Sequence, residues 1–281
     1  MDANRHFRSR AHAIAASVAV ACVVLLGPVR ASTQPSRRGP HVHARPVTAG
    51  MVRVPGGAFR PFYRAPGDGL VRVATFDLDE HAVTNAEYLA FVAAHPEWRR
   101  SRVPRLFADE GYLAQWRGDL DAGASPNQPV TRVSWFAAKA YCESHGKRLP
   151  RESEWEYAAR ASERAADGSR DRAMVQRVMQ FYARPQPTTI PDVRTTYRNH
   201  YGLWDMHGLV WEWVLDFNAT RELSDNRNPE TAEDNRFCGA SALGANDRAD
   251  YATFMRFAFR SSLSGDYTVR NLGFRCAMDV E

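Results

Sequence analysis

The sequence lacks the features that mark several common classes of protein. It contains no internal repeat and no glycine-rich loop of the nucleotide-binding kind. No recognisable Ser/His/Asp motif and no pair of carboxylates of the glycosidase type stands out in the sequence. Cysteine is scarce, with four residues in 281. These absences argue against a repeat protein, a nucleotide-binding enzyme, a serine hydrolase and a glycosidase.

The chain also lacks a strong charge of one sign. Its formal net charge is +5, but the first 31 residues hold four Arg and one Asp, and the remainder carries 33 basic against 31 acidic residues, about +2. Abundant Arg and Lys without an excess over Asp and Glu describe an ordinary mixed surface. The balance gives no electrostatic footprint for nucleic acid, and we expect none as a partner.

A long apolar run occurs only near the N-terminus. Three arginines precede the run from Ile14 to Leu26, and Val29-Arg30-Ala31 follows it as a small-x-small cleavage site. The run is too short for a transmembrane helix, so residues 1–31 are predicted to be a secretory signal peptide. We therefore expect a periplasmic or secreted protein with no membrane contact after cleavage. Residues 32–49, rich in Pro and Arg, are predicted to be a disordered linker, and residues 50–281 a single domain.

The first part of the domain predicts a hairpin and a helix. Val52 to Phe62 reads as two short strands around a Pro-Gly-Gly turn. Thr84 is placed to cap a helix that runs to about Ala93, and Glu87 completes a capping box.

Beyond this helix the local signals are weaker. Residues 96–127 are expected to be mostly loop, with a short helix near 109–117. A further helix is predicted over 173–182, from the apolar spacing there. Few long periodic segments and many aromatic residues favour an α+β fold rich in loops.

The rest of the chain is organised around residues 129–160, which predict helix, tight turn and helix. Ser134 is a suitable N-cap, and Gly146 suits the left-handed residue that ends a helix. Pro150 is tolerated at the start of the second helix. One apolar stripe marks the core-facing side of the first helix: Trp135, Ala138 and Cys142.

This stretch carries a family resemblance. AYCESHGKRLPRESEWEYAAR (140–160) resembles the hallmark of the formylglycine-generating, sulfatase-modifying-factor family. GLWDMHGLVWEW (202–213) and RNLGFRCA (270–277) resemble two further blocks of that family, and MVRVPGGAF and HAVTNAEYLAFV fit its opening hairpin and first helix. The resemblance covers roughly Gly50 to Ala277. It implies a single, irregular, loop-rich domain related to the C-type lectin fold.

The resemblance assigns roles to two of the cysteines. Cys142 and Cys276 occupy positions that the family joins by a disulfide, and export to an oxidising compartment would favour this bond. The family's second disulfide is absent, since its positions are Ala159 and Phe257. Cys238 is left without a partner in the mature chain.

A second implied feature is a calcium site in the 202–213 block. Two carboxylates and nearby backbone carbonyls supply the oxygen ligands that Ca²⁺ prefers. In the family these positions are ligands, and all four match here: Asp205, Gly208, Val210 and Glu212. The alternative is that the carboxylates only pair with arginine. Leu209 stands where the family usually has Asn, which points away from the standard activity.

The family's copper chemistry is not matched. Authentic formylglycine-generating enzymes bind Cu(I) through two cysteines and use it to activate O₂ against a substrate cysteine. Gly244 and Ala252 stand at those two positions here. Cys238, Ser241 and Arg260 remain as candidates for the same pocket, and the catalytic residues stay unknown. Copper-thiolate oxidase chemistry is therefore expected to be lost, and whether the chain is an enzyme stays open.

Cys238 allows two interpretations. It is either a buried free thiol, or a functional thiol that acts in redox chemistry or binds a metal. The histidines nearest to it among the matched motifs are His207 and His200. A copper site of Cys and His is the sharper hypothesis. Non-haem iron is disfavoured, because no pattern of two histidines and one carboxylate stands out.

The block from Phe237 to Cys276 resembles a subgroup that lacks the copper cysteines. Some of its members are encoded near copper-containing nitrite reductases and are called NirV. The resemblance implies an exported accessory protein of denitrification, with a copper nitrite reductase or another protein or peptide as partner. The alternatives are a divergent metal-dependent oxidoreductase using Cys238, and a protein-modifying oxidase acting on a peptide or sulfatase cysteine.

Overall fold

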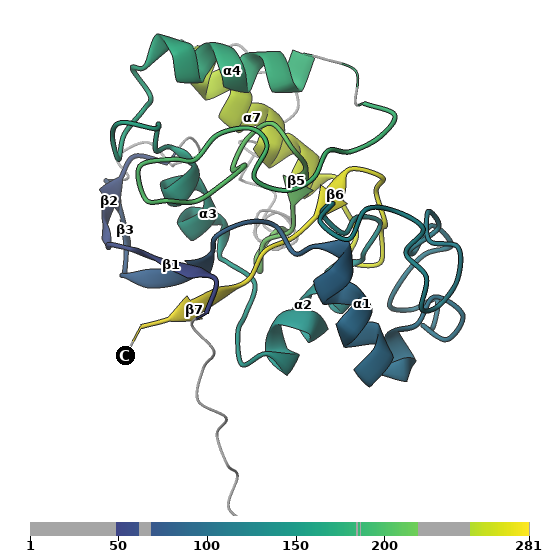
Figure 1. Cartoon of the computed structure of the whole chain (residues 1–281). Helices are drawn as coiled ribbons and strands as arrows, with labels where there is room; N and C mark the ends of the chain where they lie inside the picture. Colours follow the sequence, from purple (N-terminus) through teal and green to yellow (C-terminus); the bar gives the residue numbers. More distant parts are fainter. Residues whose placement is uncertain (1–48, 62–68, 184, 186, 219–247, 281) are drawn as a thin grey trace, which may run out of the picture. The chain divides into compact units, whose positions relative to one another are not determined.

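The computed structural model describes residues 49–61, 69–183, 185, 187–218 and 248–280 (Figure 1). The predicted signal peptide and nearly all of the predicted linker therefore lie outside the described residues, as do Cys238 and Ser241. Among the helices that the structure describes, none is long and apolar enough to cross a membrane.

A three-stranded antiparallel sheet joins the two ends of the described chain. β1 (Met51–Val54) pairs with β4 (Phe76–Asp79), and β4 pairs with β7 (Ala277–Asp279), so β4 is the central strand. All four residues of β4 are buried. The sheet thus links the first strand of the domain to its last.

The predicted opening hairpin is wrong in its pairing. β2 (Gly57–Phe59) does not fold back on β1 but pairs with β3 (Val71–Val73). The β1–β4 and β2–β3 ladders share one register: Val54 lies opposite Phe76, and Gly57 lies opposite Val73. The four strands form one long, interrupted hairpin.

Pro55 and Gly56 cause the interruption. Proline has no backbone N–H to give to a ladder. A Cβ on Gly56 would lie 2.7 Å from the backbone nitrogen of Thr75, so only glycine allows the chains to approach this closely. The Pro-Gly-Gly sequence therefore breaks a strand pair and does not form the turn that it predicted.

The first helix agrees with its prediction. α1 (Asn85–Ala94) begins after Thr84, whose hydroxyl accepts a hydrogen bond from the Glu87 backbone at 3.3 Å. The Thr84 backbone N–H donates in turn to the Glu87 carboxylate at 2.7 Å, which completes the capping box. A short 3₁₀ helix, η1 (Pro96–Trp98), follows.

Residues 109–117 form turns, so the short helix predicted there is wrong. Leu113 has φ of +48°, a left-handed conformation that a right-handed helix cannot contain. Its backbone N–H donates to the carbonyl of Arg132 at 2.9 Å. This long-range hydrogen bond takes the place of a helical one.

The central helix-turn-helix is present. α2 (Trp135–Ser144) is capped by the Ser134 hydroxyl, and Gly146 follows it with φ of +68°. α3 (Glu152–Ala159) begins two residues after Pro150. A disulfide joins Cys142 of α2 to Cys276, with the Cα atoms 5.6 Å apart. The structure thus contains the cysteine pairing that the resemblance implied.

Two longer helices and a pair of short strands complete the described elements. α4 (Arg172–Ala183) extends its prediction by one residue at each end. α7 (Arg248–Ser261), which was not predicted, packs against α4. β5 (Trp211–Glu212) and β6 (Leu272–Gly273) run parallel and bring the 202–213 block against the C-terminal segment.

Candidate functional site

α3 and α7 are joined by buried charges. The Arg256 guanidinium donates two hydrogen bonds to the Glu156 carboxylate, from Nε to Oε1 at 2.9 Å and from Nη2 to Oε2 at 2.6 Å. Arg260 donates to Glu156 at 2.9 Å and to Glu152 at 3.0 Å. Burial alone would raise the pKa of Glu156, but the two arginines lower it to about 2. Glu156 is therefore ionised between the two arginines, whereas burial raises the pKa of the neighbouring Glu152.

Trp155 connects this cluster to the 202–213 block. Its ring lies beside both arginines, 4.6 Å from the Arg260 guanidinium carbon and 5.6 Å from that of Arg256. Its indole N–H donates to Glu212 at 2.7 Å. One aromatic side chain thus links the α3–α7 charges to the predicted calcium loop.

Glu212 is held by a buried arginine. Arg275 is fully buried and donates to the two Glu212 oxygens, Nε to Oε2 and Nη2 to Oε1, both at 2.8 Å. The same guanidinium donates to the carbonyls of Asp79 and Trp204 at 3.2 and 3.0 Å. Burial opposes the charge of Arg275, but the surrounding carboxylates raise its pKa. The pairing of this carboxylate with arginine, one of the alternatives above, is therefore present.

Asp205 organises the loop that precedes Glu212. It is 1 % exposed and has φ of +58°. Its carboxylate accepts from the backbone N–H and the hydroxyl of Thr196, both at 2.8 Å, and from the backbone N–H of Arg194. Gly208, with φ of +104°, lets the chain turn back toward β5.

The donor set beside Arg275 has the chemistry that calcium prefers. The carboxylates of Asp205 and Glu212 are buried there, and their charges raise the pKa of Arg275. These two side chains offer only oxygen ligands, which suit a hard cation. A calcium ion bound there would share its carboxylate oxygens with Arg275 and Thr196. Calcium at Asp205, Gly208, Val210 and Glu212 stays a prediction.

Within the described ranges, no group of three or more cysteine, histidine and carboxylate side chains is placed to hold a metal ion, at the Asp205 loop or elsewhere. His207 donates from Nε2 to the carbonyl of Ala159 at 3.0 Å and is 3 % exposed. Burial and the nearby Arg256 lower its pKa to about 3, so this imidazole is neutral. Its hypothetical partner Cys238 lies outside the described residues.

One of the two positions predicted to match the family's copper cysteines lies among the described residues. Ala252, on the buried side of α7, is 1 % exposed and clusters with Met174 and Val178 of α4. The position is therefore closed by apolar side chains as well as lacking a thiol. Gly244, the other position, lies outside the described residues. Arg260, the third pocket candidate, is 3 % exposed and paired with Glu152 and Glu156.

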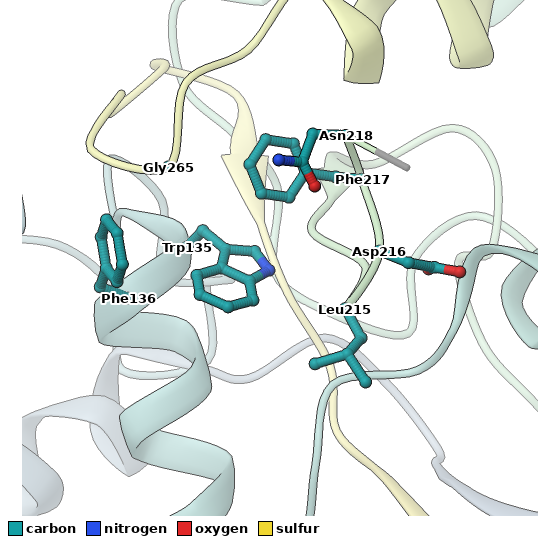
Figure 2. Close-up of a pocket in the computed structure, with 7 residues that line it drawn as sticks. All are labelled: Trp135, Phe136, Leu215, Asp216, Phe217, Asn218 and Gly265. Carbon is teal, nitrogen blue, oxygen red and sulfur yellow. The ribbon is translucent and has the colours of Figure 1, made fainter. Parts of the chain in front are cut away.

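A shallow groove of about 420 Å³ opens between the start of α2 and the segment after β5. Figure 2 shows Trp135 and Phe136 from α2 facing Phe217 and Asn218 across it, with Gly265 at one end. Four of its seven lining residues are apolar or aromatic, and it contains none of the predicted site residues. The complete lining is Trp135, Phe136, Leu215, Asp216, Phe217, Asn218 and Gly265.

Three parts of this arrangement were not predicted from the sequence: α7, the groove and the buried charge cluster. A signal for α7 does exist, because Ala252, Arg256, Arg260 and Leu263 recur at helical spacing and are all buried. Two of the four are arginines, which a hydrophobic pattern assigns to the surface.

The fold, the hallmark blocks and the Asp205–Glu212 loop together define a sulfatase-modifying-factor domain. The model of the sulfatase-modifying factor enzyme 1-like domain matches residues 38–280, and the chain belongs to this family. The predicted family and the α+β single-domain fold are thus confirmed.

Two relatives, one named as an enzyme and one as an inactive paralogue, are similar to this chain. The formylglycine-generating enzyme of Streptomyces coelicolor is 34 % identical, over 85 % of this chain and 92 % of the relative. The inactive C-alpha-formylglycine-generating enzyme 2 of Bos taurus is 28 % identical, over 82 % and 88 %. Among solved structures, PvdO from Pseudomonas aeruginosa matches 82 % of this chain and 94 % of its own, with 19 % identity and a TM-score of 0.43.

Proposed function

We propose that this protein is an exported, formylglycine-generating-enzyme-like accessory protein that has lost the copper-thiolate oxidase chemistry. Its partner is a copper enzyme of denitrification, a copper nitrite reductase, as the resemblance of residues 237–276 to the NirV-like subgroup suggests. In this proposal the domain is a binding scaffold in the periplasm, and calcium at the Asp205 loop stabilises it.

The environment of Ala252 carries the proposal. A copper-binding cysteine needs a thiolate that can reach both the metal and the substrate. Ala252 offers no thiol, and Met174 and Val178 of α4 pack on it. Restoring activity at this position would require a new side chain and also the displacement of α4. The charge cluster of Arg256 and Glu156 supports the same conclusion, because it fixes α7 against α3.

The relatives are compatible with this proposal but do not decide it. One carries the name of an active enzyme and one the name of an inactive paralogue. Active and inactive members of the family must differ at particular residues. The replacement of a copper-binding cysteine by Ala252 is a change of this kind.

An oxidase assay tests the loss of activity. The mature protein, supplied with Cu(I) and O₂, is incubated with a synthetic sulfatase-type cysteine peptide, and aldehyde formation is followed by mass spectrometry. The Streptomyces coelicolor relative serves as positive control. We expect no aldehyde above the enzyme-free background, and turnover comparable with the control would overturn the proposal.

A second assay tests the accessory role. A copper nitrite reductase is expressed in a periplasm with and without this protein, and its copper content and nitrite-reducing activity are measured. A higher copper occupancy in the presence of the protein is the expected result. Equal occupancy and activity in both strains would contradict the proposed partner.

The alternative function, a metal-dependent oxidoreductase using Cys238, has its own readout. The metal content of the mature protein is compared with that of its Cys238→Ser variant. Near-stoichiometric copper that disappears with the thiol would favour the alternative. Calcium alone, unchanged by the substitution, would favour the scaffold.

A further inference from the structure

Arginines are concentrated in the ten residues from Trp98 to Phe107, a segment with four Arg and no acidic residue. Two of them serve the fold, since Arg99 donates to the carbonyl of Val92 at 3.1 Å and Arg100 to that of Trp116 at 2.7 Å. The other two, Arg102 and Arg105, are exposed.

Arg102 and Arg105 have no carboxylate at ion-pair distance in the part of the chain that the structure describes. Asp119 lies close enough to Arg102 for this charge to lower its pKa, but hydrogen bonds from Ser101 are the larger cause. The Asp119 oxygens accept from the Ser101 backbone at 2.9 Å and from its hydroxyl at 2.6 Å. The two guanidinium groups therefore remain available for an external acidic group.

The same segment exposes apolar side chains. Leu106 is 76 % exposed, the largest value among the large hydrophobic residues that the structure describes, and Phe107 is 37 % exposed. Isolated exposed hydrophobic residues are ordinary, but adjacent ones rimmed by charge are typical of interaction sites.

A chain of ring contacts connects this segment to the groove. The ring of Phe107 lies 5.5 Å from that of Phe136 and 6.1 Å from that of Trp98, measured between centroids. Phe136 lies 5.4 Å from Trp135, and both line the groove in Figure 2. We call the set the arginine-aromatic surface: Trp98, Arg102, Arg105, Leu106, Phe107 and Phe136.

We propose that the arginine-aromatic surface docks an acidic segment of a protein partner, with an apolar side chain of that segment entering the adjoining groove. Arginine binds carboxylates through paired hydrogen bonds, and aromatic residues and Arg are enriched at protein interfaces. The apolar groove walls and the near-neutral charge of the mature chain favour a peptide over a nucleic acid. The inference rests on the proposed accessory role and specifies the chemistry of its partner.

A peptide selection tests the proposal. The mature protein is used to select from a random twelve-residue peptide library displayed on phage, and selected peptides are resynthesised for fluorescence anisotropy. We expect enrichment of Asp and Glu together with Leu, Phe or Trp, and binding that weakens as salt is raised. Selected peptides without an acidic bias would overturn the proposal.

Matched variants show where such peptides bind. Arg102→Glu/Arg105→Glu and, separately, Leu106→Ser change exposed side chains, so the fold should survive, as circular dichroism will verify. The control variant Leu70→Ser/Arg72→Glu changes an exposed leucine and an exposed arginine at β3. Affinity should fall at least tenfold in the first two variants and stay within twofold in the control. Equal effects in all three would contradict the proposal.

Two other outcomes are also decisive. Binding of single-stranded oligo(dT) that is lost in Arg102→Glu/Arg105→Glu, without peptide binding, would replace the protein partner by a nucleic acid and overturn the inference. A selection that enriches no peptide would overturn the docking surface but leave the copper and oxidase measurements untouched, so the docking surface and the lost oxidase chemistry are judged separately.

Discussion

Arg256 of α7 and Glu156 of α3 form a buried, two-pronged ion pair, although 100 residues separate them in sequence. The pair fixes the segment in which the family's copper ligands are expected against the hallmark helix. With Arg260 and Trp155 it makes α7 part of the core, and Ala252 is thereby held under α4.

Breaking this pair should strongly destabilise the fold. Glu156→Gln leaves the guanidinium of Arg256 buried without its counter-charge, and we expect a loss of about 3–5 kcal/mol in the free energy of unfolding. The control is Glu163→Gln, whose partner Arg177 is partly exposed, with an expected change below about 1 kcal/mol. Urea unfolding measures both. Similar small effects at the two sites would show that α7 is not anchored by this pair.

His207 should make the free energy of unfolding depend on pH below about pH 6.5. Burial and Arg256 lower the pKa of His207 from 6.5 to about 3. Below pH 6.5 its imidazole is therefore protonated in the unfolded chain while it stays neutral in the folded chain. The protonation of His207 in the unfolded chain does not reduce the free energy of unfolding above pH 6.5. As the pH falls from 6.5 toward 3, it reduces the free energy of unfolding by about 1.4 kcal/mol per pH unit.

The comparison is between the parent and His207→Phe. We expect the difference in their unfolding free energies to change between pH 6.5 and 5.0 by about 2 kcal/mol. The same difference should be constant between pH 7 and 8. Parallel curves over the whole range would mean that His207 is not buried in its neutral form.

The disulfide between Cys142 and Cys276 should contribute much of the net stability. Its sequence separation is 134, and closing a loop of that length contributes about 4–5 kcal/mol in the chain-entropy model. The Cys142→Ala/Cys276→Ala variant should lose about that amount in urea unfolding, and reductant should lower the parent toward it. A parent that is insensitive to reductant and no more stable than the variant would contradict the bond.

Calcium at the Asp205 loop is predicted to bind only to the folded protein and therefore to stabilise it. Elemental analysis of the mature protein should give about one calcium per chain, and a chelator should lower the melting temperature. Asp205→Ala should remove both effects, whereas Asp119→Asn, a change to a surface carboxylate bonded by Ser101, should remove neither. A melting temperature unaffected by chelator would refute the site.

The sequence predicted those elements whose causes are local. Thr84 and Ser134 cap helices by hydrogen bonds within one turn, and Gly146 ends a helix by its own backbone conformation. Such features depend on neighbours in the sequence and can be read from it. The motif residues Asp205 and Glu212 were likewise predicted to belong to one site because they lie only seven positions apart.

The failures have long-range causes. Pro55 and Gly56 looked like a turn because the pairing of β2 with β3 was not visible from the local pattern. α7 was missed because its buried face includes Arg256 and Arg260, whose burial depends on glutamates about a hundred residues earlier. A hydrophobic pattern cannot show this, since the partner that makes an arginine buriable lies elsewhere in the chain.

The most direct test of the lost copper chemistry is a Cu(I) titration of the mature protein under anaerobic conditions, in competition with a chromogenic copper chelator. A pair of cysteines in the family's copper site would take about one equivalent from the chelator, as the Streptomyces coelicolor relative should. Because Met174 and Val178 pack on Ala252, we predict that this chain takes none. One equivalent of tightly held Cu(I) would contradict the lost copper chemistry on which the proposed function depends.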